Sequence, residues 1–242
     1  IKLKYAIALV ESLKQYFEKE RIVECYLSMP PTIYQREYSS YVDFAFNAAD
    51  FSLKYREIFN VVDLRHADND QLWNNYEGRA RTSIRKSADL FDIYEDALLD
   101  DFYPVLVEDK MRKNNAAITH SLDELKKLKG IFGSKIRCDI AVNKKNGSKA
   151  GICYFAVSDR VLLTFYMAQQ TAALRLDGLN VLLHQGLRRA ITEGFQYLDF
   201  GSSTMGYQIS NIGVAEFKEG FGSFGAFRES FAWKKTDNIE FD

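Results

Sequence analysis

The chain has 242 residues, of which 47% are hydrophobic and 27% charged, and its formal net charge at pH 7 is −1. This length is enough to bury a full core, as one large domain or as two small ones. The nearly neutral charge excludes a global field that would attract nucleic acid or a membrane surface, so an anionic partner must meet a local patch.

The distribution of cysteine and histidine further limits the class of protein. Cys25, Cys138 and Cys153 are widely spaced in apolar, strand-like contexts, which predicts reduced, buried thiols and a cytoplasmic location. No histidine pairs with a nearby cysteine or histidine, so we expect no metal site. No run of about 18 apolar residues and no signal peptide is present, and we therefore expect no membrane span.

The first third of the chain predicts one helix and a few strands. Helical spacing of apolar residues predicts a helix from Leu3 to Lys19, and alternation predicts a strand from Arg21 to Leu27. Another strand is expected near Phe59 to Leu64. These elements are too few to bury much surface, so we interpret them as part of a domain.

The next segment predicts a basic helix from Asp68 to Ala88, with an aspartate as its N-cap. It contains Arg79, Arg81, Arg85 and Lys86, with no acid between positions 79 and 86. Arg81 and Arg85 are neighbours at i, i+4, and an anion would relieve their repulsion. Two readings stay open: a patch for phosphate or an RNA backbone, or a solvated face beside the acidic stretch from Asp89 to Asp101.

The rest of the chain predicts a mixed sheet. A helix is expected from Ala97 to Asn114, and another begins at the capping box formed by Ser121 and Glu124. A three-stranded meander follows, in the ranges 135–143, 149–157 and 161–167, with an Asn-Gly hairpin turn between its first two strands. An amphipathic helix at 179–191 then leads to a strand at 197–200, which makes a βαβ unit with two parallel strands.

Two loops of this sheet are candidate sites. Arg175, Gly178, Leu179 and Asn180 precede or open the amphipathic helix, whose N-terminal backbone N–H groups suit a pyrophosphate or a carboxylate. By itself this is a weak signal, and a plain helix cap is the commoner explanation of such a loop. Tyr166 and Gln169 end the preceding strand and are expected to line the cleft where parallel strands diverge.

The second loop follows the strand at 197–200. Ser202 and Ser203 begin it, and the later run Phe217-Lys218-Glu219-Gly220-Phe221-Gly222 places one lysine among aromatic residues and glycines. An ammonium group in such a place can meet a phosphate or a developing oxyanion. The alternative is a solvated lysine in a surface loop.

The order of meander, glycine loop, helix and strand resembles the GNAT N-acyltransferases. Arg175-x-x-Gly178-x-Asn180 matches their pyrophosphate loop except at Asn180, which would crowd a pyrophosphate and disfavours ordinary use of coenzyme A. The run from Phe217 to Gly222 resembles more narrowly the FemAB-like branch, whose members carry tandem GNAT-like domains. The resemblance covers residues 55–235. It implies a mixed α/β fold with an incomplete GNAT-like domain at 1–66 and an acyltransferase domain at 67–242.

The resemblance also implies a reaction, the transfer of an acyl or aminoacyl group to an amine, with a peptidoglycan-precursor peptide as one candidate acceptor. The donor would be a co-substrate, aminoacyl-tRNA or acyl-coenzyme A, and no tightly bound cofactor is expected. Lys218 matches the family lysine that stabilises charge, and Phe217 would lie at the substrate. Asp199 and Tyr207 are candidate bases with equally plausible structural roles, and Arg81 and Arg85 would contact tRNA.

Two alternatives remain open. One is an N-acetyltransferase that uses acetyl-coenzyme A and acts on a small amine or sugar amine. The other is a non-catalytic module that binds a phosphorylated ligand, which the absence of an evident base supports.

Overall fold

The computed structural model describes residues 1–113, 118–204 and 212–235. Its strands hydrogen-bond in the order β1-β8-β2-β7-β6-β5-β4-β3, and by its contacts the chain divides into two compact units. The first unit takes its described residues from 1–59, 202–211 and 225–242, and the second from 60–201 and 212–224.

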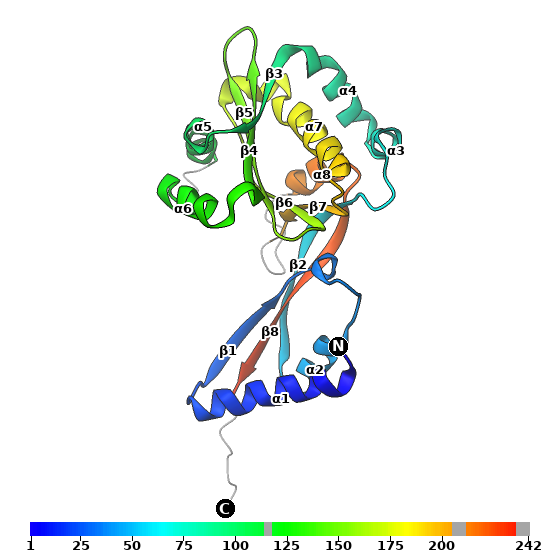
Figure 1. Cartoon of the computed structure of the whole chain (residues 1–242), viewed down its shortest axis with the longest axis vertical. Coiled ribbons are helices and arrows are strands. Elements are labelled where there is room, and N and C mark those ends of the chain that lie inside the picture. The colour runs from blue at the N-terminus through cyan, green and yellow to red at the C-terminus, as the bar shows by residue number, and fades with distance from the viewer. Residues whose placement is uncertain (114–117, 205–211, 236–242) are drawn as a thin grey trace, which may run out of the picture. The chain divides into compact units, whose positions relative to one another are not determined.

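The first unit contains two helices and three strands. Helices α1 (Leu3–Lys19) and α2 (Tyr41–Ala48) pack on strands β1 (Glu24–Met29), β8 (Phe224–Lys234) and the first part of β2 (Ser52–Asp63) (Figure 1). Strand β8 pairs antiparallel with β1, with Leu27 opposite Phe231. The core of this unit is aromatic: the ring centroids of Phe17 and Trp233 are 5.2 Å apart.

The second unit is a mixed sheet with helices on both faces. Its strands are β3 (Phe91–Ala97), β4 (Ile136–Asn143), β5 (Lys149–Ala156), β6 (Val161–Gln169), β7 (Tyr197–Ser202) and the end of β2. Strands β3 to β6 are antiparallel neighbours, and β6 pairs parallel with β7, which confirms the predicted meander and βαβ unit.

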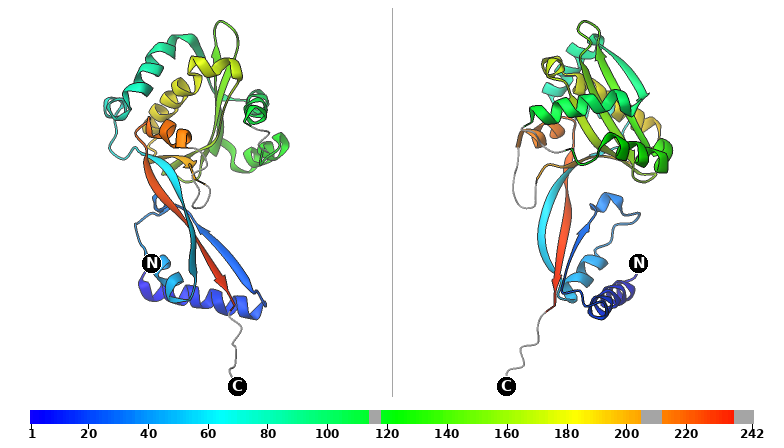
Figure 2. Two further views of the ribbon diagram at one scale, coloured as in Figure 1. Left: turned by 180° about the vertical axis from the view of Figure 1, so that it is seen from behind. Right: turned by 90° about the vertical axis from the view of Figure 1, so that its left-hand side faces the viewer.

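Two separate clusters of apolar side chains cover the faces of this sheet. Helices α3 (Asn69–Asn75), α4 (Gly78–Ser87) and α7 (Gly178–Thr192) share one cluster, whereas α5 (Leu99–Arg112) and α6 (Leu122–Phe132) share the other (Figure 2). Helix α8 (Ile212–Glu219) lies on the same face of the sheet as α7 (Figure 1). Both predicted caps are confirmed, because Asp68 and Ser121 each form a capping box.

The structure corrects several predicted elements. The expected helix from Asp68 to Ala88 is two helices, because Tyr76 and Glu77 adopt extended backbone and the Glu77 N–H donates to the Gly220 carbonyl. The acidic stretch holds the edge strand β3, of which only Phe91 is buried. Helix α2 and strand β8 were not predicted.

The two units also differ in their bounds from the predicted division into residues 1–66 and 67–242. The reason is that β8, near the C-terminus, pairs with β1 and contributes Phe231 and Trp233 to the N-terminal core. That residues 1–66 derive from a GNAT-like domain stays a prediction.

Candidate functional site

The second unit contains a pocket of about 950 Å³. Its walls come from one face of α4, the end of β6, the start of α7, and α8 with the turn that follows it. The lining side chains with polar or aromatic groups are Glu77, Arg79, Thr82, Ser83, Lys86, Gln169, Asp177, Asn180, Glu216, Phe217, Glu219 and Phe221.

Helix α4 presents a basic face to this pocket, but with residues other than the predicted pair. Arg79 and Lys86 are exposed and line the pocket. Arg81 instead donates from Nη1 to the carbonyls of Asn74 (3.2 Å) and Tyr76 (2.6 Å) and so fixes the corner between α3 and α4. Arg85 lies over the Trp73 ring, 5.1 Å from its centroid. The structure therefore does not place Arg81 and Arg85 on the pocket wall.

The start of α7 forms the second wall. Asp177 has a left-handed backbone with φ 54° and lines the pocket, and the buried Gly178 follows it. A Cβ at Gly178 would lie 3.0 Å from the Phe91 ring, so this glycine permits close packing of helix on sheet. Leu179 belongs to the core, and only the backbone of Arg175 is described.

The fourth residue of the predicted loop, Asn180, lines the pocket and is already engaged. Its side-chain amide donates to Ser83 Oγ at 2.6 Å, which ties α7 to α4. A pyrophosphate at this loop would have to lie beside the Asp177 carboxylate and compete with that hydrogen bond. This arrangement is less favourable for coenzyme A than the sequence pattern alone indicates.

The end of β6 contributes Gln169 but not Tyr166. Gln169 lines the pocket, and its Oε1 is buried without a hydrogen-bond partner among the described atoms. Tyr166 packs with the cluster of α5 and α6 on the other face of the sheet, where its hydroxyl lies 2.7 Å from His120 Nδ1. Burial raises the pKa of Tyr166. The structure thus separates two residues that the sequence placed in one cleft.

The pocket has more acidic than basic side chains. The carboxylates are Glu77, Asp177, Glu216 and Glu219, and the cations are Arg79 and Lys86. Such a wall favours a ligand that carries an ammonium group over one that carries only phosphates.

The aromatic and glycine residues of the run from Phe217 to Gly222 each have a structural role in α8 and the turn that follows it. Phe217 lines the pocket, and its ring lies 5.5 Å from that of the buried Phe221. The Gly220 carbonyl accepts from Glu77 N–H at 3.0 Å. Gly222 has φ 75°, and a Cβ there would lie 3.0 Å from the Asn75 carbonyl oxygen. The turn therefore needs glycine at position 222.

Lys218 is buried behind the pocket wall. The residue is 2% exposed, and its Nζ donates to the Gly201 carbonyl at 3.0 Å. Burial lowers its pKa to about 8, and the Asp199 carboxylate acts in the opposite direction. Asp199 is fully buried, and its Oδ1 accepts from Gly201 N–H at 2.7 Å. Gly201 is thus hydrogen-bonded to both Asp199 and Lys218.

The remaining predicted residues lie elsewhere. Ser202 and Ser203 belong to the first unit, where Ser203 N–H donates to the Ile58 carbonyl at 2.8 Å. Ser202 Oγ donates to the Thr204 carbonyl, within its own turn. Tyr207 lies outside the described residues. The roles predicted for these residues stay predictions.

Sequence patterns placed Arg79 and Lys86 in the basic stretch but did not single out Thr82, Ser83, Glu216 or Glu219. Arg79, Thr82, Ser83 and Lys86 follow i, i+3, i+4, i+7 spacing and so share one face of α4, a signal that was available. Glu216 and Glu219 are likewise three apart on α8. That the faces of two short helices meet over the start of α7 depends on tertiary packing, which no local spacing reveals.

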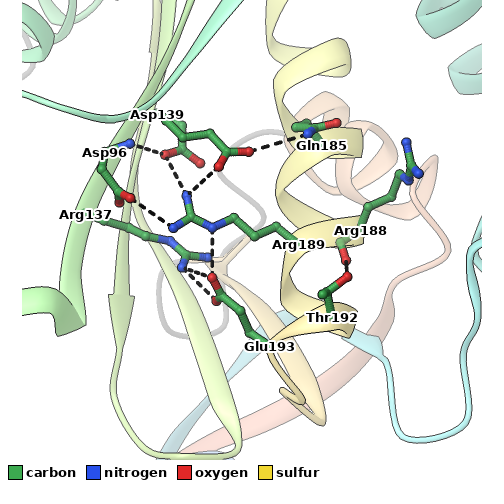
Figure 3. Close-up of polar contacts among 9 residues, drawn as sticks. Asp96, Arg137, Asp139, Gln185, Arg188, Arg189, Thr192 and Glu193 are labelled. Atoms are coloured by element: carbon green, nitrogen blue, oxygen red, sulfur yellow. Dashed lines mark hydrogen bonds and ion pairs between the residues drawn. The ribbon is translucent and has the colours of Figure 1, made fainter.

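A second polar cluster lies at the opposite end of α7 (Figure 3). Arg189 Nη2 donates to Asp96 Oδ2 at 3.0 Å, and its Nη1 forms an ion pair with the buried Asp139 at 3.5 Å. Glu193 accepts from both Arg137 and Arg189. Because both guanidinium groups are paired with carboxylates, we interpret this cluster as the attachment of α7 to β3 and β4 and not as a ligand site.

Residues 1–113, 118–204 and 212–235 contain neither a metal-binding cluster nor a membrane-spanning helix. No group of three or more histidine, cysteine or acidic side chains there could hold a metal ion. No helix in the same ranges has both the length and the apolar character needed to cross a membrane.

Comparison with known proteins identifies the fold. No family model and no curated protein matches the chain. Solved structures do: FemX has a TM-score of 0.75 at 11% identity, over 94% of this chain and 76% of its own. L-PGS from Bacillus licheniformis has a TM-score of 0.59 at 12% identity, over 95% and 73%.

A third similar structure is a tandem GNAT protein from the clavulanic acid biosynthesis pathway. Its TM-score is 0.54 at 9% identity, over 95% of this chain and 70% of its own. These identities are low, so the likeness concerns the fold. The chain therefore has a GNAT-like fold, similar to those of FemX, L-PGS and the tandem GNAT protein.

Proposed function

We propose that this protein is an N-acyltransferase that moves an acyl or aminoacyl group onto an amine. The observation that carries the proposal is a buried lysine, Lys218, next in sequence to the pocket residue Phe217 in a unit with a GNAT-like fold. A lysine is rarely buried without a partner or a task. With a pKa of about 8, its ammonium group is largely retained at pH 7 in a low-dielectric setting.

The reaction needs such a charge. The acceptor amine attacks the carbonyl carbon of an ester or thioester, which forms the C–N bond and places negative charge on the carbonyl oxygen. Collapse of this tetrahedral species breaks the bond to the leaving oxygen or sulfur, which departs with a proton lost by the amine. An ammonium group held beside the oxyanion stabilises it, and orientation of a neutral amine supplies much of the remaining rate.

Within this proposal, the donor is an aminoacyl group carried by tRNA. An aminoacyl ester has a free α-ammonium group, which suits the acidic excess of the pocket better than a pyrophosphate does. The position of Asp177 at the start of α7 also weighs against acyl-coenzyme A as the donor. The acceptor we propose is the amine of a peptidoglycan-precursor peptide, as the FemAB-like resemblance implies.

The test is transfer by the Lys218→Ala variant, followed by mass spectrometry of the acceptor. We expect the rate to fall by about 10²–10³-fold, the usual effect of removing one oxyanion-stabilising group. Lys127→Ala, at an exposed position of α6, is the matched control and should retain the rate. Unchanged transfer by Lys218→Ala would remove the role assigned to this lysine.

Donor identity is tested separately by calorimetry. We expect aminoacyl-tRNA to bind and acetyl-coenzyme A not to bind. Micromolar binding of acetyl-coenzyme A, lost when Asn180 is changed, would support the acetyltransferase alternative. Binding of a phosphorylated ligand with no transfer from any donor would support the non-catalytic alternative.

A further inference from the structure

Three groups near the end of β7 form a connected set inside the second compact unit. Asp199 Oδ1 accepts from Gly201 N–H at 2.7 Å, and the Gly201 carbonyl accepts from Lys218 Nζ at 3.0 Å. Asp199 and Lys218 are 0% and 2% exposed. One glycine residue therefore connects a buried carboxylate to a buried ammonium group.

Gly201 is the backbone element that makes this link. Its φ is 73°, in the left-handed region that glycine adopts readily, and a Cβ there would meet no atom within 4 Å. The left-handed turn brings its N–H toward Asp199 and leaves its carbonyl for Lys218. The Asp199 hydrogen bond thus helps to hold the carbonyl that accepts from the ammonium group.

Among the residues that the structure describes, Asp199 is the acid whose charge acts on Lys218. Strand β6, which pairs with β7 at Leu163 and Asp199, has no charged residue between Val161 and Gln169. Asp63, at the end of β2, is partly exposed and bound to Arg65. The other acids and cations of α4 and α8 near this region line the pocket, on the side of Phe217. They are Glu77, Arg79, Lys86, Glu216 and Glu219, whereas Arg81 is bound to the Tyr76 carbonyl and Arg85 lies over Trp73.

We infer that Asp199 is a positioning residue that holds the Lys218 ammonium group in place through Gly201, and is not a general base. This inference rests on the proposed acyl transfer. A base must reach the proton it removes, whereas the Asp199 carboxylate is fully buried and accepts from a backbone N–H. The favourable charge of Asp199 opposes the burial that lowers the Lys218 pKa.

The test measures the Lys218 amine directly, by NMR titration of protein labelled with [13Cε]lysine, with Lys218→Arg to assign the signal. We expect Asp199→Asn, which keeps an acceptor for Gly201 but removes the charge, to lower the Lys218 pKa by about 1 unit, the lower end of a close charge effect. The pH above which transfer declines should move down by the same amount. Asp63→Asn should move neither value.

Each outcome decides one question. An unmoved Lys218 signal in Asp199→Asn overturns the inference whether or not transfer occurs. A moved signal without transfer from any donor overturns the proposed function and leaves the link intact. If Asp199→Asn does not fold, the wild-type protein with a 13Cγ-labelled aspartate decides: the Asp199 signal must respond at the pH where Lys218 titrates. No response contradicts the link.

Discussion

Single residues in the turn after α8 have distinct physical tasks. Phe221 fills the core between Phe200 and Tyr76, and its ring centroid is 5.2 Å from that of Tyr76. Gly222 permits the left-handed turn that packs against Asn75. The turn that follows Lys218 therefore requires a large aromatic side chain at position 221 and glycine at position 222.

At Gly222 we predict that substitution by alanine lowers the free energy of unfolding. A left-handed alanine costs roughly 1–2 kcal/mol, and the close Asn75 carbonyl adds to that cost. Gly147→Ala is the matched control, because Gly147 has φ 70° but a Cβ there would meet no atom within 4 Å. Urea unfolding should show a larger loss for Gly222→Ala; equal losses would exclude the Asn75 contact as a cause.

At the scale of one element, α7 connects two polar regions. Its first turn lines the pocket through Asp177 and Asn180, and its last turns hold Arg189 and Glu193 in the cluster of Figure 3. The apolar face between them packs on the sheet, and a Cβ at Gly186 would overlap the Tyr154 hydroxyl. The position of the pocket wall thus depends on contacts at both ends of this helix.

We predict that Arg189→Met destabilises the fold by roughly 3 kcal/mol, since it leaves Asp139 buried without its ion pair. Arg188→Met is the matched control on the same helix, because Arg188 is exposed and its guanidinium donates to the Asn69 side chain at 3.3 Å. Chemical denaturation of both variants should show a much smaller decrease in the free energy of unfolding for Arg188→Met than for Arg189→Met.

The decrease in the free energy of unfolding caused by Arg189→Met should also depend on pH. Burial raises the pKa of Asp139, and removal of Arg189 raises it further. A carboxyl group with a folded-state pKa above its unfolded value disfavours the folded state as pH rises through that range. We therefore expect a smaller loss at pH 5 than at pH 8; a loss independent of pH would contradict the role of Asp139.

For the whole molecule, charge must act locally. A net charge of −1 supplies no long-range attraction for RNA, so binding of the tRNA donor that we propose would depend on the few cations that face the pocket. The sequence pointed to Arg81 and Arg85, but the structure places Arg79 and Lys86 on the wall. The two pairs lie on one helix and can be compared directly.

We predict that Arg79→Glu with Lys86→Glu weakens tRNA binding and lowers the slope of log K against log salt by about 1 per lost phosphate contact. Arg81→Glu with Arg85→Glu is the comparison, checked for folding by circular dichroism because Arg81 fixes the α3–α4 corner. A larger effect of the second pair on tRNA binding, with the fold retained, would favour the interpretation from sequence.

Local signals predicted much of the fold. The Asn146-Gly147 turn, the capping box at Ser121 and the apolar face of α7 each depend on neighbours within a few residues, so their elements are confirmed. Strand β3 was missed because an edge strand with exposed acids reads as a solvated segment. The break at Tyr76 was missed because it depends on a hydrogen bond to Gly220.

The amino-acid sequence alone was enough to predict the mixed α/β class and the parallel pair around α7, and it singled out the region from Phe217 to Gly222 as a candidate site. The folded structure was needed to show that Lys218 is buried and linked to Asp199, that Tyr166 and Gln169 face opposite sides of the sheet, and that Arg79 lines the pocket. The physical reason is that periodicity and turn chemistry are local, whereas burial and charge pairing arise between segments far apart in the chain.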